Sequence, residues 1–254
     1  MKEQGILRGV WRLIYPVLLY ELLSLLAVDL VCRVPGITEG TASLTSIVLT
    51  AVIAVPVFKW MCRQDEAKFP YVQEYLPMHP YYLIWGISSC AALALLGNVI
   101  ISLTPLMEWS ERFWETQEIL TSGSMPMQIL ATVLAAPILE EMLIRGVLYP
   151  RMRGVMGVKA AVVFSSALFA LLHGNLVQGV YAFVMGAYFA WLMERFGNIW
   201  VPILGHMSAN LFVTLMGYGD FAERFFGNGT NFILELIICA ACVGRTVQIL
   251  GEER

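Results

Sequence analysis

The feature that most constrains this chain is a set of long stretches without a single charged residue. Five such stretches occur, at residues 40–58, 80–107, 119–139, 160–193 and 196–219. A helix that crosses the hydrocarbon core of a bilayer needs roughly 20 mostly apolar residues, and each stretch is close to that length or longer. Backbone polar groups inside a bilayer must be satisfied within the protein, so these stretches predict membrane-spanning helices.

The composition supports the same interpretation. Of the 254 residues, 58% are hydrophobic and only 14% are charged, and the mean hydropathy is +0.70. An average soluble domain carries about 25% charged residues, so this chain has too few charges to cover a surface exposed to water. The net charge is −3 and no basic stripe is present, which argues against a nucleic-acid partner. Membrane lipid is the expected surrounding.

We predict an all-α, polytopic membrane bundle of about eight transmembrane helices. Their approximate bounds are 11–31, 41–61, 80–104, 124–149, 157–173, 176–194, 198–217 and 230–250. Gly174-Asn175 is the expected break inside the longest charge-free stretch. The first apolar run contains Glu21 and Asp29, so we interpret it as an uncleaved first span. No linker divides the chain, and residues 1–254 are expected to form a single membrane domain.

The placement of Lys and Arg predicts the orientation of the bundle. With both termini in the cytoplasm, twelve of the sixteen basic residues lie in inside segments, three lie outside, and Arg145 lies within the membrane. Cytoplasmic loops of membrane proteins carry such an excess of Lys and Arg. We therefore expect a multi-pass protein of the cell membrane with both termini cytoplasmic.

One outer segment, before the fourth predicted span, has the pattern of an amphipathic helix. Four glutamates recur at helical spacing, and aromatic residues fall between them, namely Glu108, Glu111, Glu115 and Glu118 with Trp109, Phe113 and Trp114. This pattern is typical of a helix that lies in the membrane interface. An ordinary solvated loop is the alternative.

The fourth predicted span contains three ionisable residues, which are costly in a bilayer and are functional candidates by default. They are Glu140, Glu141 and Arg145. Glu141 and Arg145 are four residues apart, so they can pair on one helix face. Glu140 points about 100° away from Glu141 and is expected to have no cation on its own helix, which leaves it for chemistry. Pro137 removes a backbone hydrogen bond one turn earlier and predicts a kink in the helix near Glu140.

Polar side chains also occur on two later stretches of the chain. Phe169 and His173 are four residues apart, as are His206 and Asn210, so each pair shares a helix face. From the helical rise, Glu140, His173 and His206 lie roughly 13, 24 and 12 Å from the cytoplasmic side. With allowance for tilt and uncertain bounds, these depths permit one shared cavity. A single buried histidine is more often a structural residue, and the combination points to a catalytic or transport site.

These residues resemble the motifs of a known family. Glu140-Glu141-x-x-x-Arg145, continued by Gly146 and Leu148, is similar to the first motif of the CPBP intramembrane proteases, the type II CAAX prenyl endopeptidase and bacteriocin-processing (Abi) family. Phe169-x-x-x-His173 resembles the second motif, and His206-x-x-x-Asn210 resembles the third. The three motifs occur in the family's order, over a CAAX protease-like core at about residues 124–215.

The resemblance implies an intramembrane endopeptidase and assigns a role to each motif residue. Glu140 would be the general base, His173 would orient the water, and His206 with Asn210 would stabilise the oxyanion. Glu141, Arg145 and Phe169 would support them. Peptide hydrolysis needs an activated water and donors aimed at the developing oxyanion, so these assignments are chemically sensible.

The resemblance leaves the cofactor open. Glu140, His173 and His206 are also candidate Zn²⁺ ligands, since such side chains form zinc sites with a position left for water. The His-Glu-x-x-His signature of zincins is absent from the sequence. The residues fit a metalloprotease and a metal-free mechanism; we favour direct glutamate catalysis with no cofactor and keep Zn²⁺ as the alternative.

The expected partner is a protein or peptide substrate. Membrane-associated or prenylated CAAX-type proteins and bacteriocin-like peptides fit equally well. A non-catalytic membrane regulator or a bacteriocin self-immunity protein on the same fold is the main alternative. A small transporter is a further one, because buried Glu and His also form proton relays.

Overall fold

The computed structural model describes residues 2–66, 75–217 and 229–252, and within them the chain is helical with no strand. The predicted all-α membrane fold is confirmed. The chain forms two compact units. The first unit comprises residues 1–71 and 116–165, and the second comprises residues 72–115 and 166–254. Each unit is described below by itself.

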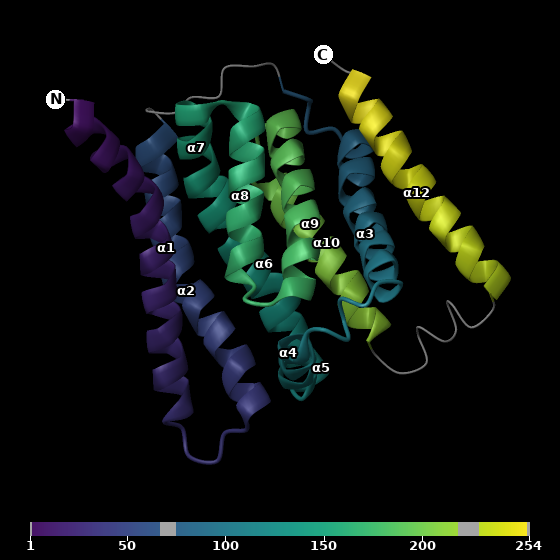
Figure 1. Ribbon diagram of the computed structural model, residues 1–254, viewed down its shortest axis with the longest axis horizontal. Helices are drawn as coiled ribbons and strands as arrows, with labels where there is room; N and C mark the ends of the chain where they lie inside the picture. The colour runs from purple at the N-terminus through teal and green to yellow at the C-terminus, as the bar shows by residue number, and fades with distance from the viewer. Residues whose placement is uncertain (1, 67–74, 218–228, 253–254) are drawn as a thin grey trace. The chain divides into compact units, whose positions relative to one another are not determined.

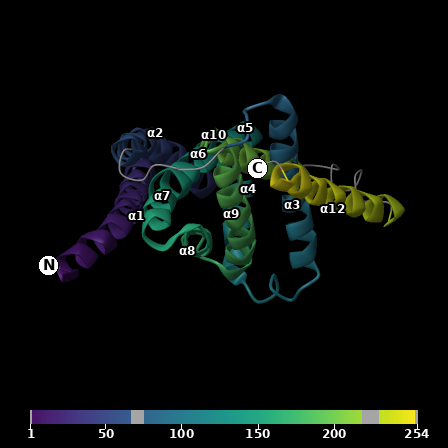
Figure 2. The ribbon, with the colours of Figure 1, turned by 90° about the horizontal axis from the view of Figure 1, so that it is seen from above.

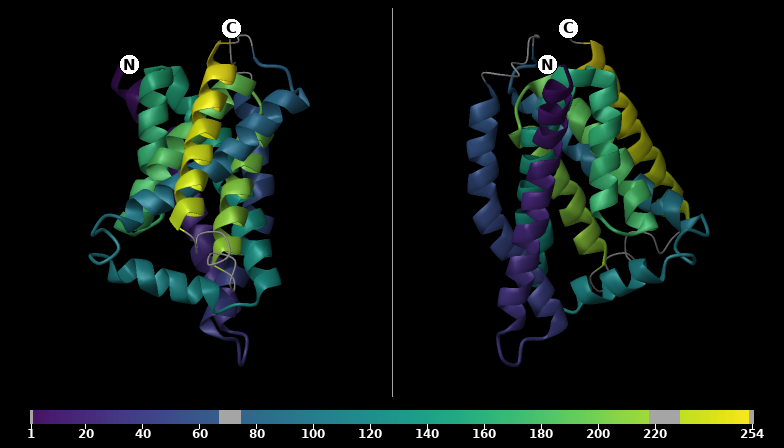
Figure 3. Two further views of the ribbon diagram at one scale, coloured as in Figure 1. Left: turned by 90° about the vertical axis from the view of Figure 1, so that its right-hand side faces the viewer. Right: turned by 60° about the vertical axis from the view of Figure 1, so that its left-hand side comes forward.

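The first unit is built on two long helices and one long interrupted helix. The long helices α1 (Lys2–Cys32) and α2 (Glu39–Glu66) run side by side in opposite directions (Figure 1; Figure 3). The interrupted helix runs from residue 125 to residue 156 through five segments, α5 (Met125–Gln128), η1 (Ile129–Ala135), α6 (Ala136–Glu141), η2 (Met142–Leu148) and α7 (Tyr149–Met156). It packs mainly on α2. Gly157, with φ of +78°, separates it from α8 (Val158–Leu172).

Each interruption in this helix lies just before a proline. η1 and η2 are π-helical, and the α-helical segment after each carries a proline at its second position, Pro137 and Pro150. A proline lacks the N–H for the i−4 carbonyl and its ring crowds that carbonyl, so the turn before it widens. π turns lie on both sides of the Glu140-Glu141 pair, and the kink that Pro137 predicts near Glu140 stays a prediction.

In the second unit α3 (Pro80–Ser102) packs against two other helices, α10 (Trp200–Met216) and α12 (Gly229–Glu252). α3 and α12 lie against each other in both Figure 1 and Figure 2. Hydroxyl groups join the helices at two points. Ser208 donates to the Ile87 carbonyl at 2.8 Å, and Thr246 donates to the Trp85 carbonyl at 3.2 Å.

The remaining helices of the second unit begin and end at signals in the sequence. α8 ends at Leu172, Gly174 has a φ of +69°, and the side chain of Asn175 accepts a hydrogen bond from the Gln178 N–H at 2.9 Å. Asn175 is therefore the N-cap of α9 (Leu176–Phe196). The predicted break at Gly174-Asn175 is confirmed.

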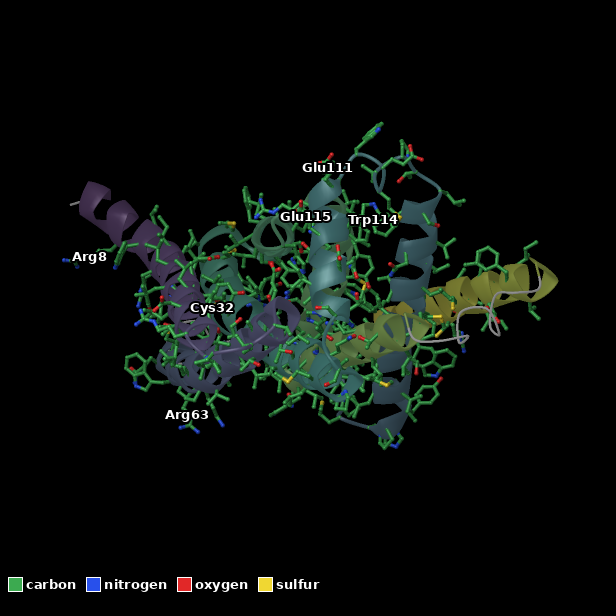
Figure 4. All side chains as sticks on the ribbon, turned by 90° about the horizontal axis from the view of Figure 1, so that it is seen from below. Arg8, Cys32, Arg63, Glu111, Trp114 and Glu115 are labelled. Atoms are coloured by element: carbon green, nitrogen blue, oxygen red, sulfur yellow. The ribbon has the colours of Figure 1, made fainter. Side chains whose placement is uncertain are left out.

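Part of the amphipathic outer segment forms a helix, α4 (Glu111–Thr121), in which none of the described residues is buried. Glu108 and Trp109, which the prediction included, lie in turns before it. Trp114 is 54% exposed. Figure 4 places it on a different side of α4 from Glu115. The same view shows Arg8 and Arg63, on α1 and α2, reaching outward from the first unit. A helix rather than a plain loop therefore forms here, as the interface interpretation requires.

All eight predicted apolar helices are present, but they differ in length. In the described part of the chain, six helices are long and apolar enough to cross a membrane. The other two, α8 and α10, have 15 and 17 residues, which corresponds to about 23 and 26 Å of helix. This is short of a hydrocarbon core of about 30 Å. The protein is a multi-pass membrane protein with six candidate spans and two shorter apolar helices.

Candidate active site

Glu141 and Arg145 form a fully buried ion pair in the first unit. The Arg145 Nη1 lies 3.1 Å from the Glu141 Oε1, and both side chains are 0% exposed. The pairing predicted from the i, i+4 spacing is confirmed. Two opposite charges offset part of each other's cost of burial. The pair therefore assigns a structural role to two of the three ionisable residues between residues 140 and 145.

Glu140 differs from Glu141 in its exposure. It is half-buried, on the turn between the two π segments. Arg145 interacts electrostatically with Glu140 as well as with Glu141. The expectation that Glu140 lacks a cation on its own helix is therefore wrong. The reason lies in η2, because a π turn joins residues five apart and brings the spacings i+4 and i+5 onto one face.

Two further contacts in the first unit were not predicted from the sequence. The hydroxyl group of Tyr20, on α1, lies close enough to Glu140 to interact with its charge. The backbone of Gly146, in η2, lies so close to α2 that a Cβ on it would stand 2.8 Å from the Cys62 Sγ. Gly146 therefore permits the close approach of the glutamate-bearing helix to α2. Both contacts are long-range, and no local spacing signals them.

In the second unit the ring of Phe169 brings the two histidines of the predicted site together. Its centroid lies 4.8 Å from the His173 ring and 5.7 Å from the His206 ring, both edge to face. Phe169 is 2% exposed. The i, i+4 spacing predicted the first contact. The second joins α8 to α10, so the second and third motifs meet in one cluster.

The His206 ring also stacks on Phe189 of α9, with centroids 4.9 Å apart and planes inclined by 25°. His206 is 6% exposed. Its imidazole thus contacts two aromatic rings, which restrict the orientation of its plane. Asn210 follows one turn later on α10 and is half-buried. Sequence reasoning missed Phe189, because it lies in an apolar stretch of α9 in which nothing in the sequence distinguishes it from its neighbours.

His173 has a defined tautomer at the end of α8. Its Nδ1 lies 2.8 Å from the Phe169 carbonyl oxygen. A carbonyl can only accept, so the Nδ1 carries the proton and donates it to this carbonyl in the last turn of α8. The lone pair of the neutral ring then belongs to Nε2. That nitrogen is able to accept a hydrogen bond from water or to bind a metal.

Gly205, directly before His206, allows α10 to approach α3 closely. A Cβ on Gly205 would lie 2.6 Å from the Cys90 Sγ, and Cys90 is 0% exposed. The position of the His206 backbone therefore depends on the absence of a side chain at residue 205.

Gly205→Ala is expected to destabilise the protein by about 1–3 kcal/mol, because the added methyl group overpacks the contact with Cys90. Thermal unfolding of the purified protein in detergent measures the loss. The double variant Gly205→Ala/Cys90→Ala removes the clashing sulfur and should recover most of the stability. Gly244→Ala, where a Cβ meets nothing within 4 Å, is the control. Equal effects of the substitutions at residues 205 and 244 would contradict the packing argument.

The predicted site residues thus form two groups, one in each unit. Glu140, Glu141 and Arg145 belong to the first unit, whereas Phe169, His173, His206 and Asn210 belong to the second. A meeting of Glu140 with the histidines stays a prediction. Within the described residues no three potential ligands gather at a metal site, so a Zn²⁺ site would need that meeting. The donor set fits such a site, because a metal-binding histidine ordinarily donates its other N–H to a carbonyl, as His173 does.

Comparison with known proteins agrees with the three motifs. Residues 122–212 match the family described as "Type II CAAX prenyl endopeptidase Rce1-like". Over 93 residues the chain is 33% identical to the Bacillus subtilis (strain 168) protein named "Putative membrane peptidase YdiL". This alignment covers 37% of the chain and 38% of that relative's length. No solved structure matches the chain. The resemblance to the CPBP proteases is confirmed over this segment.

Proposed function

We propose that this chain, whose residues 122–212 match the Rce1-like family of type II CAAX prenyl endopeptidases, is an intramembrane endopeptidase. The observation that carries the proposal is the division of labour between the two glutamates. Glu141 is fully buried in its bond to Arg145, whereas Glu140, one residue earlier, is half-buried. A structural clamp needs only one carboxylate. The second, Glu140, lies on a turn flanked by π segments, which frequently mark functional sites, and we assign the chemistry to it.

In the proposed mechanism Glu140 accepts a proton from a water as the water oxygen attacks the carbonyl carbon of the peptide. The tetrahedral intermediate carries a negative oxygen, to which His206 and Asn210 donate hydrogen bonds. Its C–N bond then breaks, and Glu140 returns the proton to the departing amine nitrogen. His173, with its proton on Nδ1, accepts a hydrogen bond from the water through Nε2. Atoms and charges balance over the cycle.

Two classes of substrate fit the proposal, prenylated CAAX-type proteins and unmodified membrane-associated peptides. Purified full-length protein in lipid vesicles would be incubated in ¹⁸O-labelled water with two probes. One probe is a farnesylated peptide that ends in a CAAX sequence, and the other is a proteome-derived peptide library. New carboxyl termini that carry ¹⁸O, detected by mass spectrometry, are the expected result. If neither probe yields such termini above the level of the Glu140→Gln protein, the proposal of endopeptidase activity fails.

The metal content of the purified protein distinguishes a zinc-dependent mechanism from a metal-free one, since both would use the same residues. Were Zn²⁺ bound, Glu140, His173 and His206 would hold it, and the ion would polarise the carbonyl and acidify the water. We favour the metal-free mechanism and expect less than about 0.1 Zn²⁺ per chain after purification without chelators. Elemental analysis by mass spectrometry measures this. Stoichiometric zinc that is lost in both His173→Ala and His206→Ala would overturn the metal-free mechanism.

We also propose that both termini lie in the cytoplasm, because the twelve-to-three excess of Lys and Arg favours that side.

A further inference from the structure

A second buried charged cluster lies in the first unit, away from the glutamates. Its centre is Arg151 on α7, which is 3% exposed and pairs with Asp65 of α2, 4% exposed. The Arg151 Nε donates to Asp65 Oδ2 at 2.5 Å, and Nη2 donates to the Tyr15 hydroxyl at 2.9 Å. The guanidinium carbon also lies 5.1 Å from the centre of the Tyr15 ring, within range of a cation–π interaction. One side chain thus joins α1, α2 and α7.

The remaining contact of Arg151 depends on a proline in α1. Nη1 donates to the backbone carbonyl of Arg12 at 2.5 Å. In a regular helix that carbonyl would accept from the N–H four residues later, but the residue there is Pro16, inside α1, and proline has no N–H. Pro16 therefore frees the carbonyl to which Arg151 binds. The planar fork of an arginine can serve a carboxylate and a carbonyl at once, as a lysine cannot.

The cluster lies on the same helices as the glutamate turn. α7 continues η2 without a break, so Arg151 is on the helix that carries Glu140. On α2, Asp65 is three residues after Cys62, which contacts Gly146 of η2. Two contacts less than a helical turn apart on α2 therefore hold the segment from Gly146 to Arg151. Because π turns bond less regularly than α turns, this segment needs outside contacts to keep its register.

We propose that Arg151 is a positioning residue that sets the register of the Glu140-Glu141 turn through the carbonyl freed by Pro16. This inference rests on the proposed function, since Glu140 is the base that it positions. The consequence is that a residue of α1 controls a site motif in another helix. A proline inside a helix ordinarily destabilises the helix by about 3 kcal/mol. Here the proline makes the Arg12 carbonyl available to Arg151.

Pro16→Ala distinguishes a positioning role from a merely structural one, because the two roles predict different effects on kcat and on the stability of α1. The substitution restores an N–H at residue 16, which competes with Arg151 for the Arg12 carbonyl. A structural role alone predicts a more stable α1 and unchanged chemistry. Positioning predicts that η2 moves away from α2 and that kcat falls about tenfold at an unchanged KM, because small displacements of a catalytic group cost such factors. Arg151→Lys, which keeps the charge and loses the fork, should behave in the same way.

Two measurements on the full-length protein in vesicles decide the question. The first is kcat and KM for the probe that the wild type cleaves fastest. The second is the rate of N-ethylmaleimide alkylation at Cys62, followed by mass spectrometry with the fully buried Cys90 as the internal reference. Pro56→Ala, at an exposed proline inside α2, is the matched control. Thermal unfolding of each variant checks that the fold is retained.

The expected result is a severalfold faster alkylation of Cys62 in Pro16→Ala and Arg151→Lys, with Cys90 unchanged and with the lower kcat. Unchanged alkylation and kcat in Pro16→Ala would overturn the inference, as would a loss of thermal stability alone in Arg151→Lys. The alkylation needs no substrate. If the wild type cleaves neither probe, the proposed function fails, while the alkylation rates still decide whether Arg151 sets the register of η2 against α2.

Discussion

Replacing Glu140 by glutamine is expected to lower kcat/KM by about 10²–10⁴-fold, the range that a positioned general base contributes. The amide has nearly the same shape as the carboxylate and is unable to take a proton from water. Glu140 is half-buried, so the neutral side chain leaves no uncompensated charge inside the protein. The ¹⁸O incorporation assay measures the fall, and thermal unfolding should change little.

A matched control separates loss of the base from loss of charge. Glu111→Gln removes a carboxylate from α4, where no described residue is buried, and should keep activity within about twofold, as surface substitutions generally do. If Glu140→Gln retains more than a tenth of the wild-type rate, the base is a different group. If it instead unfolds the protein, Glu140 shares the structural role that we assign to Glu141.

The sequence predicted the parts of the structure that depend on local spacing. Long, mostly apolar stretches predicted the eight apolar helices, because burial in lipid leaves a helix as the simplest way to satisfy the backbone. The i, i+4 rule predicted the contacts of Glu141 with Arg145 and of Phe169 with His173. It could do so because both partners lie within one turn of the same helix.

Features that depend on packing between helices were not predictable in this way. The stacking of Phe189 on His206 joins two helices, and the distance between these residues in the sequence does not predict their contact. The π turns on both sides of Glu140 were also missed, because a proline marks an irregularity without fixing its form. That omission produced the one error in the site, since a regular α-helix separates Glu140 from Arg145 and a π turn does not.

Replacing Arg145 by methionine is expected to destabilise the protein by about 3–5 kcal/mol, the cost of breaking a buried ion pair by removing one partner. Both side chains of the pair with Glu141 are 0% exposed, and the bond is 3.1 Å long. Without the guanidinium, the buried Glu141 carboxylate loses the opposite charge with which it pairs. Reversible unfolding in mixed micelles of increasing denaturing detergent measures the free energy of unfolding.

Two double variants show which glutamate depends on Arg145. Glu141→Gln/Arg145→Met removes both buried charges and should recover more than half of the lost stability, because a neutral pair of similar volume is often tolerated in the interior. Glu140→Gln/Arg145→Met leaves Glu141 charged and should recover little, since Glu140 is half-buried whereas Glu141 is fully buried. Equal recovery in the two would mean that Arg145 serves both carboxylates alike. Glu141 would then be no more structural than Glu140, and the division of labour on which the proposed mechanism rests would have to be abandoned.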